Sequence, residues 1–268
     1  MRGMGRKLKN APVYYVLAQV RFNTVALLDR YVPDLQDSLR KAGYPDFNKA
    51  VLATISMDLG GGGAQVVPAL ESHARYQFLN ASRTSGFLLD QSSLSFQTTD
   101  YDVFEPFSEA LLSGIEILHK NVELSFSERL GLRYFDAVCP REGETLSQYL
   151  IPSMLSLSDQ IGDRNLIHAS SETKTQKGKV FLLGRVTILN QPTVGVAFPQ
   201  ELQPIALQVT EKFRGISGLY GIIDTDSWIE GREKFDLGEI KKSLISLRDE
   251  VRFSFGQMAT PHALNVWN

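Results

Sequence analysis

Residues 101–138 read YDVFEPFSEALLSGIEILHKNVELSFSERLGLRYFDAV, a helix pattern followed by a strand pattern. Asp102 and Glu105 have the spacing of a capping box, which satisfies free amide groups at the start of a helix. The apolar residues that follow recur at helical spacing: Phe104, Phe107, Leu111, Ile115 and Leu118. Leu130–Val138 then alternates between two faces, as a strand does. This stretch therefore predicts an amphipathic helix that packs on a sheet.

The residues before this stretch predict more strands and another helix. Val13–Phe22 alternates with a period of two and predicts a strand, and Pro33–Lys41 predicts a helix. Arg75–Ala81 and a strand that begins at Phe87 predict a hairpin, with a bulge or tight turn at residues 90–93. The order strand, helix, hairpin, helix, strand is that of a ferredoxin-like βαββαβ sandwich, in which two helices cover one face of an antiparallel sheet.

The second half of the chain predicts a further sheet and a long final helix. Its strand candidates are residues 166–176, 179–189, 195–198, 205–213 and 219–224. Asp236 and Glu239 form a second capping-box pattern, followed by the apolar stripe Ile240, Leu244, Leu247, Val251 and Phe255. The predicted architecture is α+β. A ferredoxin-like unit spans residues 1–142, a connector spans 143–165, and an antiparallel-sheet unit closed by the C-terminal helix spans 166–268.

The composition excludes several classes of protein. The 268 residues are 43% hydrophobic and 22% charged, which argues against a disordered, collagen-like or membrane chain. The 28 Lys and Arg residues are balanced by 30 Asp and Glu residues, so the chain has no net positive charge to attract nucleic acid. Any nucleic-acid binding must therefore use a local group of cations. Cys139 is the only cysteine, so neither an intrachain disulfide nor a cysteine-based zinc site can form. We find no signal-peptide or transmembrane pattern and expect a cytoplasmic protein without a membrane partner.

Motifs for cofactor binding and catalysis are missing. Gly60–Gly63 is followed by AQVVP instead of the Lys-Ser or Lys-Thr pair of a phosphate-binding loop, so it predicts a flexible loop. The four histidines lie far apart, and the chain has no Gly-x-Ser-x-Gly nucleophile elbow. We therefore predict no cofactor, assign no catalytic residue and favour a non-enzymatic protein.

One candidate site lies on the predicted sheet face opposite the helices. Arg21 and Arg133 fall on this face, and their strands are neighbours in the commonest ferredoxin-like order. Tyr15 and Phe135 share the face. Arginines and aromatic rings on an open sheet can contact phosphates and stack on bases of single-stranded RNA. The alternative, which the mildly acidic chain favours, is that this face packs against the second half or against another subunit.

A second candidate site is acidic. Asp224 and Asp226 are two residues apart, so their carboxylates fall on the same side of an extended segment. Oxygen ligands of this kind suit magnesium, commonly together with substrate phosphates. The alternative is a solvated acidic turn at the end of a strand.

Four segments carry a resemblance to a known group of proteins. They are VRF at Val20–Phe22, VPDLQ at Val32–Gln36, LSFQTTDY at Leu94–Tyr101 and ERLGLRY at Glu128–Tyr134. Together they resemble an uncharacterised, sporadically distributed bacterial family. The resemblance implies a cytoplasmic bacterial protein of patchy occurrence and no established activity or catalytic residues.

The missing motifs and this resemblance together predict a non-enzymatic bacterial interaction protein, linked to defence or toxin neutralisation. Its expected partner is another protein or a second copy of the chain. RNA or nucleotide binding through the arginine face is the alternative, followed by a metal-dependent phosphate enzyme that uses the two aspartates.

Overall fold

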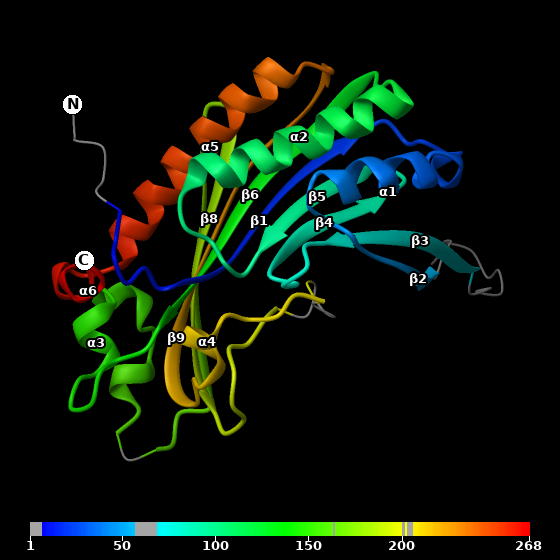
Figure 1. The fold of residues 1–268 in the computed structure, drawn as a ribbon. Helices are drawn as coiled ribbons and strands as arrows, with labels where there is room; N and C mark the ends of the chain where they lie inside the picture. The colour runs from blue at the N-terminus through cyan, green and yellow to red at the C-terminus, as the bar shows by residue number, and fades with distance from the viewer. Residues whose placement is uncertain (1–6, 57–68, 163, 200–201, 203–205) are drawn as a thin grey trace, which may run out of the picture.

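The computed structural model describes residues 7–56, 69–162, 164–199, 202 and 206–268, and it contains a nine-stranded antiparallel sheet with long helices on one face (Figure 1). The strands are β1 (Val13–Phe22), β2 (Asp46–Ser56), β3 (Ala69–Leu79), β4 (Ser85–Asp90), β5 (Ser93–Thr98), β6 (Phe126–Val138), β7 (His168–Lys177), β8 (Val180–Gln191) and β9 (Gly218–Lys234). Their order across the sheet is β2-β3-β4-β5-β1-β6-β9-β8-β7. The predicted α+β class with an antiparallel sheet is confirmed.

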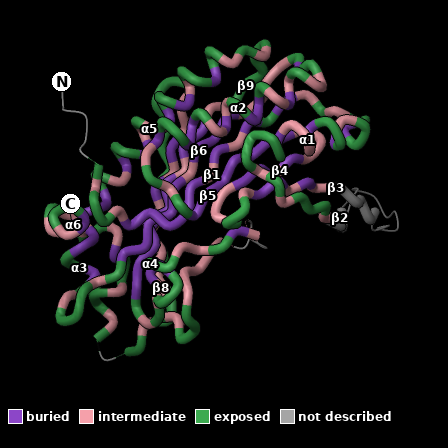
Figure 2. The backbone as a smooth tube through the Cα atoms, viewed as in Figure 1, coloured by how far each residue is buried: buried purple, intermediate pink, exposed green. Residues whose placement is uncertain are grey.

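The helices are α1 (Val32–Lys41), α2 (Phe104–Val122), α3 (Leu146–Tyr149), α4 (Glu211–Arg214), α5 (Leu237–Met258) and α6 (Pro261–Trp267), with short 3-10 turns η1 (Leu28–Arg30), η2 (Pro152–Met154) and η3 (Ser158–Gln160). Helices α1, α2 and α5 lie on one face of the sheet (Figure 1). Burial is concentrated in the central strands and in the helix sides that face them (Figure 2). None of the described helices has the length and apolar content needed to cross a bilayer.

The two predicted helix starts have different outcomes. At α5 the side chain of Asp236 accepts a hydrogen bond from the amide of Glu239, as the capping pattern predicts. At α2 the residue before the helix is Val103, and no side chain caps the helix. Asp102 instead forms an exposed ion pair with Lys7. The apolar stripe of α2 is buried as predicted, so packing and not the cap determines this helix.

The ferredoxin-like arrangement is not confirmed, because the first half contributes more strands than that fold has. The bulge or tight turn predicted at residues 90–93 is a tight turn that separates β4 from β5. Strand β2 pairs with β3 and extends the sheet further. One expected neighbour pair is present: β1 pairs with β6. Strand β5 pairs with β1 on its other side.

The second half continues the same sheet. Strand β9 pairs with β6 along most of its length, so the sheet runs through the predicted boundary at residues 143–165. The division into two units stays a prediction. Strands β7 and β8 form at the predicted positions, whereas residues 195–198 form no strand and residues 211–214 are the short helix α4. The loop Gly60–Gly63 lies outside the described residues.

The connection between β8 and β9 lies over the sheet face opposite the helices. We call its residues 194–199 and 206–216 the strap. Tyr14 donates a hydrogen bond to the carbonyl of Ala197, and the amide of Gln208 bonds to the carbonyl of Arg83 at the β3–β4 turn. Apolar residues of the strap and of the sheet beneath it form a separate buried cluster that includes Leu207 and Phe213. The strap therefore covers part of this face, as in the alternative that the sequence favours, in which the face packs against the second half.

Candidate functional site

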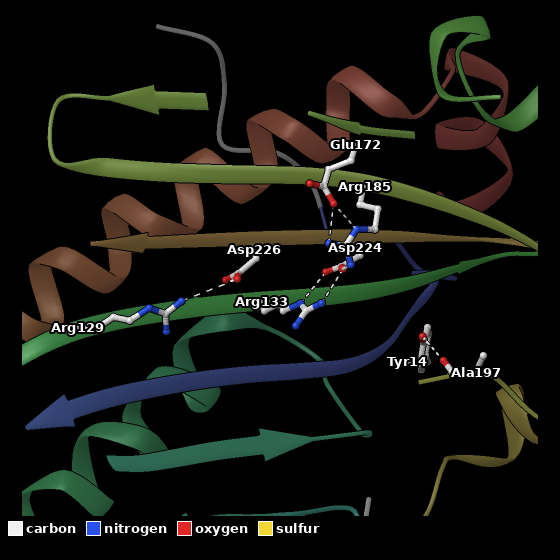
Figure 3. A network of polar contacts seen from close by, with 8 residues as sticks. All are labelled: Tyr14, Arg129, Arg133, Glu172, Arg185, Ala197, Asp224 and Asp226. Atoms are coloured by element: carbon white, nitrogen blue, oxygen red, sulfur yellow. Dashed lines mark hydrogen bonds and ion pairs between the residues drawn. The ribbon is translucent and has the colours of Figure 1, made fainter. Parts of the chain in front are cut away.

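Arg133 and Asp224, one residue from each candidate site, form a buried ion pair on the sheet face opposite the helices (Figure 3). Arg133 lies on β6 and Asp224 on β9, which pair directly. Nε and Nη2 of Arg133 each lie 2.8 Å from a different carboxylate oxygen of Asp224. The side chains are only 13% and 3% exposed. Such a bidentate pair fixes both groups, and neither charge is left uncompensated.

A second arginine extends this pair toward the edge of the sheet. Nη1 of Arg185, on β8, lies 3.4 Å from Oδ2 of Asp224, and its Nη2 lies 2.6 Å from Oε2 of Glu172 on β7. Strand register places these residues in one row, because Asp224 lies opposite Arg185 and Arg185 lies opposite Glu172. Charges therefore alternate in sign from Asp224 outward to Glu172, and the row is held together by the sheet itself.

Asp226 belongs to a looser group on the same face. Nη2 of Arg129 lies 3.9 Å from Oδ2 of Asp226, and Nε of Arg129 lies 3.8 Å from Oε1 of Glu230. Burial raises the pKa of Asp226, while Arg133 and Arg129 act in the opposite direction. The guanidinium of Arg129 also lies over the ring of Trp228, 5.7 Å from its centroid. Asp226 is thus a partly solvated member of a charge network.

Tyr15 and Phe135 lie beneath the strap. They are 1% and 0% exposed, and the ring of Phe198 in the strap packs edge-on against Tyr15 at a centroid distance of 5.4 Å. The hydroxyl of Tyr15 donates a hydrogen bond to the side-chain oxygen of Gln97, at 2.7 Å. The sequence left two alternatives for these rings, contact with RNA or packing against protein. In the structure they pack against the second half of the chain. Neither ring is available to stack on a base.

Phe198 is expected to stabilise the strap. Phe198→Ala removes a half-buried ring from Tyr14 and Tyr15, so the free energy of unfolding should fall by about 1–3 kcal/mol. Val194→Ala, at a strap position that is 71% exposed, should change it by less than ~0.5 kcal/mol. Urea denaturation measures both values. Equal effects would show that the ring contacts do not hold the strap on the sheet.

Arg21 is the one residue of the predicted arginine face that is exposed. It lies opposite Arg129 in the β1–β6 pairing, so two cations are adjacent at this end of the face. Arg133, in contrast, is held by Asp224. A phosphate would have to compete with a bidentate carboxylate for Arg133, which removes the main reason to expect nucleic acid on this face.

The acidic pair offers little to a metal ion. Asp224 accepts hydrogen bonds from two arginines, whose positive charges oppose binding of a cation nearby. Within the described ranges, no group of three His, Cys, Asp or Glu side chains is placed to hold a metal. The two aspartates contribute instead to one network of ion pairs.

A cavity of about 260 Å³ lies at the far end of β6, between α4 and α6. Cys139 and Lys212 line it together with the rings of Phe213 and Trp267. The pKa of the Cys139 thiol is raised, mainly by burial, so the thiol is not activated as a nucleophile. The cavity is smaller than typical ligand pockets, which measure roughly 300–1,000 Å³.

Asp136 is a buried carboxyl group near this cavity. It is 6% exposed, and burial raises its pKa to about 8, with Lys212 acting in the opposite direction. Burial also lowers the pKa of Lys212, whose ammonium group donates a hydrogen bond to the carbonyl of Ala11. The raised pKa favours the neutral form of Asp136 near pH 7, so this group contributes to stability in a pH-dependent way.

The sequence patterns missed three contributors to this face: Arg185, Arg129 and the strap. Strand alternation indicates which face a side chain occupies, but it does not indicate which residue of a neighbouring strand lies opposite. The only available signal for Arg185 was its position in an alternating strand.

The chain has no match among protein-family models or among curated proteins.

Proposed function

We propose that the protein acts by binding another polypeptide, and that β7 is the edge at which it does so. Strand β7 is the last strand of the sheet and, within the part of the chain that the structure describes, it is paired only with β8. It is ten residues long, its register with β8 has no bulge, and eight of its ten side chains are exposed. An unpaired edge of this kind can accept an additional strand.

The direction of the free backbone groups follows from one hydrogen bond. The amide of Asn190 donates to the carbonyl of Ile167, immediately before β7. Because hydrogen-bonded and non-hydrogen-bonded pairs alternate in an antiparallel ladder, the odd-numbered residues of β7 bond to β8. The even-numbered residues, His168, Ser170, Glu172, Lys174 and Gln176, therefore direct their amide and carbonyl groups away from the sheet. These groups are the proposed contacts.

The charge network supports binding in preference to catalysis. The candidate residues Arg133 and Asp224 neutralise each other, and Tyr15 and Phe135 are covered. The backbone at the β7 edge, in contrast, is accessible, and such an edge recognises an extended chain by hydrogen bonding. A role in bacterial defence or toxin neutralisation is part of this proposal and rests on the sequence resemblance.

A proline at an outward-facing amide tests the proposal. Ser170→Pro removes one outward N–H and leaves the bonds to β8 intact, so the fold should persist while partner binding is lost. Ser170→Ala keeps the N–H and should bind as the wild type does. Affinity copurification from the organism that encodes the protein, with the stoichiometry of the retained chains determined, measures binding, and thermal melting monitors the fold.

Two outcomes would contradict the proposal. One is a wild-type protein that is monomeric and retains no polypeptide. The other is a stoichiometric partner retained equally by Ser170→Pro and Ser170→Ala, because binding would then not use the β7 edge.

A further inference from the structure

We propose that the chain bound at the β7 edge is a second copy of this protein, in the antiparallel register that places Glu172 of each copy opposite Lys174 of the other. This inference rests on the proposed function. It assigns the partner and the register, and it predicts a two-fold symmetric dimer in which the nine-stranded sheets of the two copies join edge to edge.

The direction of the backbone groups restricts the possible registers. Only even-numbered residues of β7 present free amide and carbonyl groups, so an even-numbered residue of one copy must lie opposite an even-numbered residue of the other. For two antiparallel copies related by a two-fold axis, the axis then passes through a β7 residue. The two most central positions for the axis are residues 172 and 173, and residues 171 and 174 come next.

The charges of β7 favour one of these four registers. With the axis at Ser171, Glu172 lies opposite Ser170 and Lys174 lies opposite His168, so no opposite charges meet. With the axis at Glu172, the Glu172 carboxylates of the two copies lie opposite each other. With the axis at Lys174, the two Lys174 ammonium groups do so. Like charges directly opposite on neighbouring strands are destabilising. With the axis at Thr173, Glu172 lies opposite Lys174 twice, once on each side of the axis. This register also keeps residues 169–177 of both copies in the ladder.

The row of alternating charges within one copy supports the same register. Asp224, Arg185 and Glu172 follow one another outward across β9, β8 and β7. In the Thr173 register the next residue across the junction is Lys174 of the second copy, so the alternation of sign continues. Each Glu172 carboxylate is then flanked by two cations, Arg185 of its own chain and Lys174 of the second copy, on the same face of the joined sheet.

Lys174 is placed to make this contact without unfolding any local structure. Its side chain is exposed, and its ammonium group lies over the rings of Trp228 and Phe181, at 4.9 and 5.8 Å from their centroids. Directly opposite residues in a ladder have Cβ atoms about 5 Å apart, so a change of rotamer brings the ammonium group to the opposing carboxylate.

Charge exchange tests the register. Glu172→Lys gives each copy two lysines at these positions, and Lys174→Glu gives each copy two glutamates. Each variant alone then places like charges opposite one another, and we expect its dimer dissociation constant to rise at least ~10-fold. A mixture of the two variants restores opposite charges in a heterodimer, and the double variant Glu172→Lys/Lys174→Glu restores them in a homodimer.

The matched control is Lys177→Glu. It makes the same charge change as Lys174→Glu in the same strand and costs the ion pair of Lys177 with Glu250 of its own chain. In the proposed register residue 177 lies opposite Ala169, so the dimer should persist. Sedimentation equilibrium over a range of micromolar concentrations measures mass for the wild type, the single variants and the mixture. Circular dichroism and thermal melting confirm that each variant folds. Because the charge pairs are exposed, high salt should reduce the difference between the variants.

The outcomes separate this inference from the function on which it rests. Wild-type dimers, single variants that dissociate and a mixture that associates would support the second copy and the register. A wild-type monomer that still binds a different protein, with loss of binding in Ser170→Pro, would overturn the inference and leave the function standing. Wild-type dimers that both single variants leave unchanged would overturn the register.

Discussion

Asp224→Ala should lower the free energy of unfolding by about 3–5 kcal/mol, the cost of removing one partner from a buried ion pair. The carboxylate is 3% exposed, and both of its contacts with Arg133 are 2.8 Å long. Without it, the 13% exposed guanidinium of Arg133 keeps its desolvation penalty and loses its bidentate partner, and Arg185 loses a second contact. Urea denaturation at pH 7 measures the loss.

The control for this prediction is Arg129→Ala. Arg129 makes ion contacts at 3.8 and 3.9 Å on the same sheet face and is 21% exposed. Loose and partly solvated pairs contribute little, so its loss should cost less than ~1 kcal/mol. Replacing Arg133 and Asp224 together by leucine should recover most of the stability lost in Asp224→Ala, because both charges of the buried pair are removed. Equal costs for Asp224→Ala and Arg129→Ala would contradict this account of the network.

Local patterns predicted the elements that a hydrophobic period determines. The stripe of α2 and that of α5 each specify a helix face, and both faces are buried against the sheet. Alternation in β1 and β6 separates their two faces, and the neighbouring position of these strands was predicted correctly. A period fixes which side chains are buried, and burial stabilises the element, so such segments can be identified without knowledge of the rest of the chain.

Contacts between distant segments could not be predicted in this way. The alternation in β1 correctly places Tyr15 on the face opposite the helices, but it contains no signal for the strap that covers it. The described residues of the strap contain no strand and no long helix. Single contacts attach it to the sheet, such as the packing of Phe198 on Tyr15 and the hydrogen bond that Tyr14 donates to the carbonyl of Ala197. Irregular segments have no period from which burial could be inferred.

The candidate site shows the same limit. The sequence offered Arg133 as a candidate for nucleic-acid contact and Asp224 as a candidate metal ligand, because each was considered by the chemistry of its own residue type. The register of β6 and β9 places Asp224 diagonally across from Arg133, within reach of its guanidinium, and each removes the reason for the other's candidate role. Ion pairs across strands depend on register, and register is set by the whole sheet.

Asp136 should make the protein less stable as the pH rises. Burial raises its pKa from an ordinary value of 3.8 to about 8 in the folded state. Between these two values the folded chain holds a proton that the unfolded chain has released, so unfolding releases that proton. The free energy of unfolding therefore falls with increasing pH through this window, by up to ~1.4 kcal/mol per pH unit. Its contribution is fully present below about pH 4 and is lost as the pH approaches 8.

Asp136→Asn removes this dependence, because asparagine resembles the neutral carboxyl group and does not titrate. The variant should match the wild type near pH 4 and exceed it by several kcal/mol at pH 8, as estimated from the pKa difference. The stability difference between variant and wild type, from urea denaturation at each pH, cancels the titration of other groups. Asp102→Asn, the same substitution at a side chain that is 71% exposed, is the control and should not raise the free energy of unfolding at pH 8. A difference for Asp136→Asn that stays constant from pH 5 to 8 would mean that Asp136 is ionised in the folded protein, with Lys212, the cation that opposes its raised pKa, compensating the buried charge.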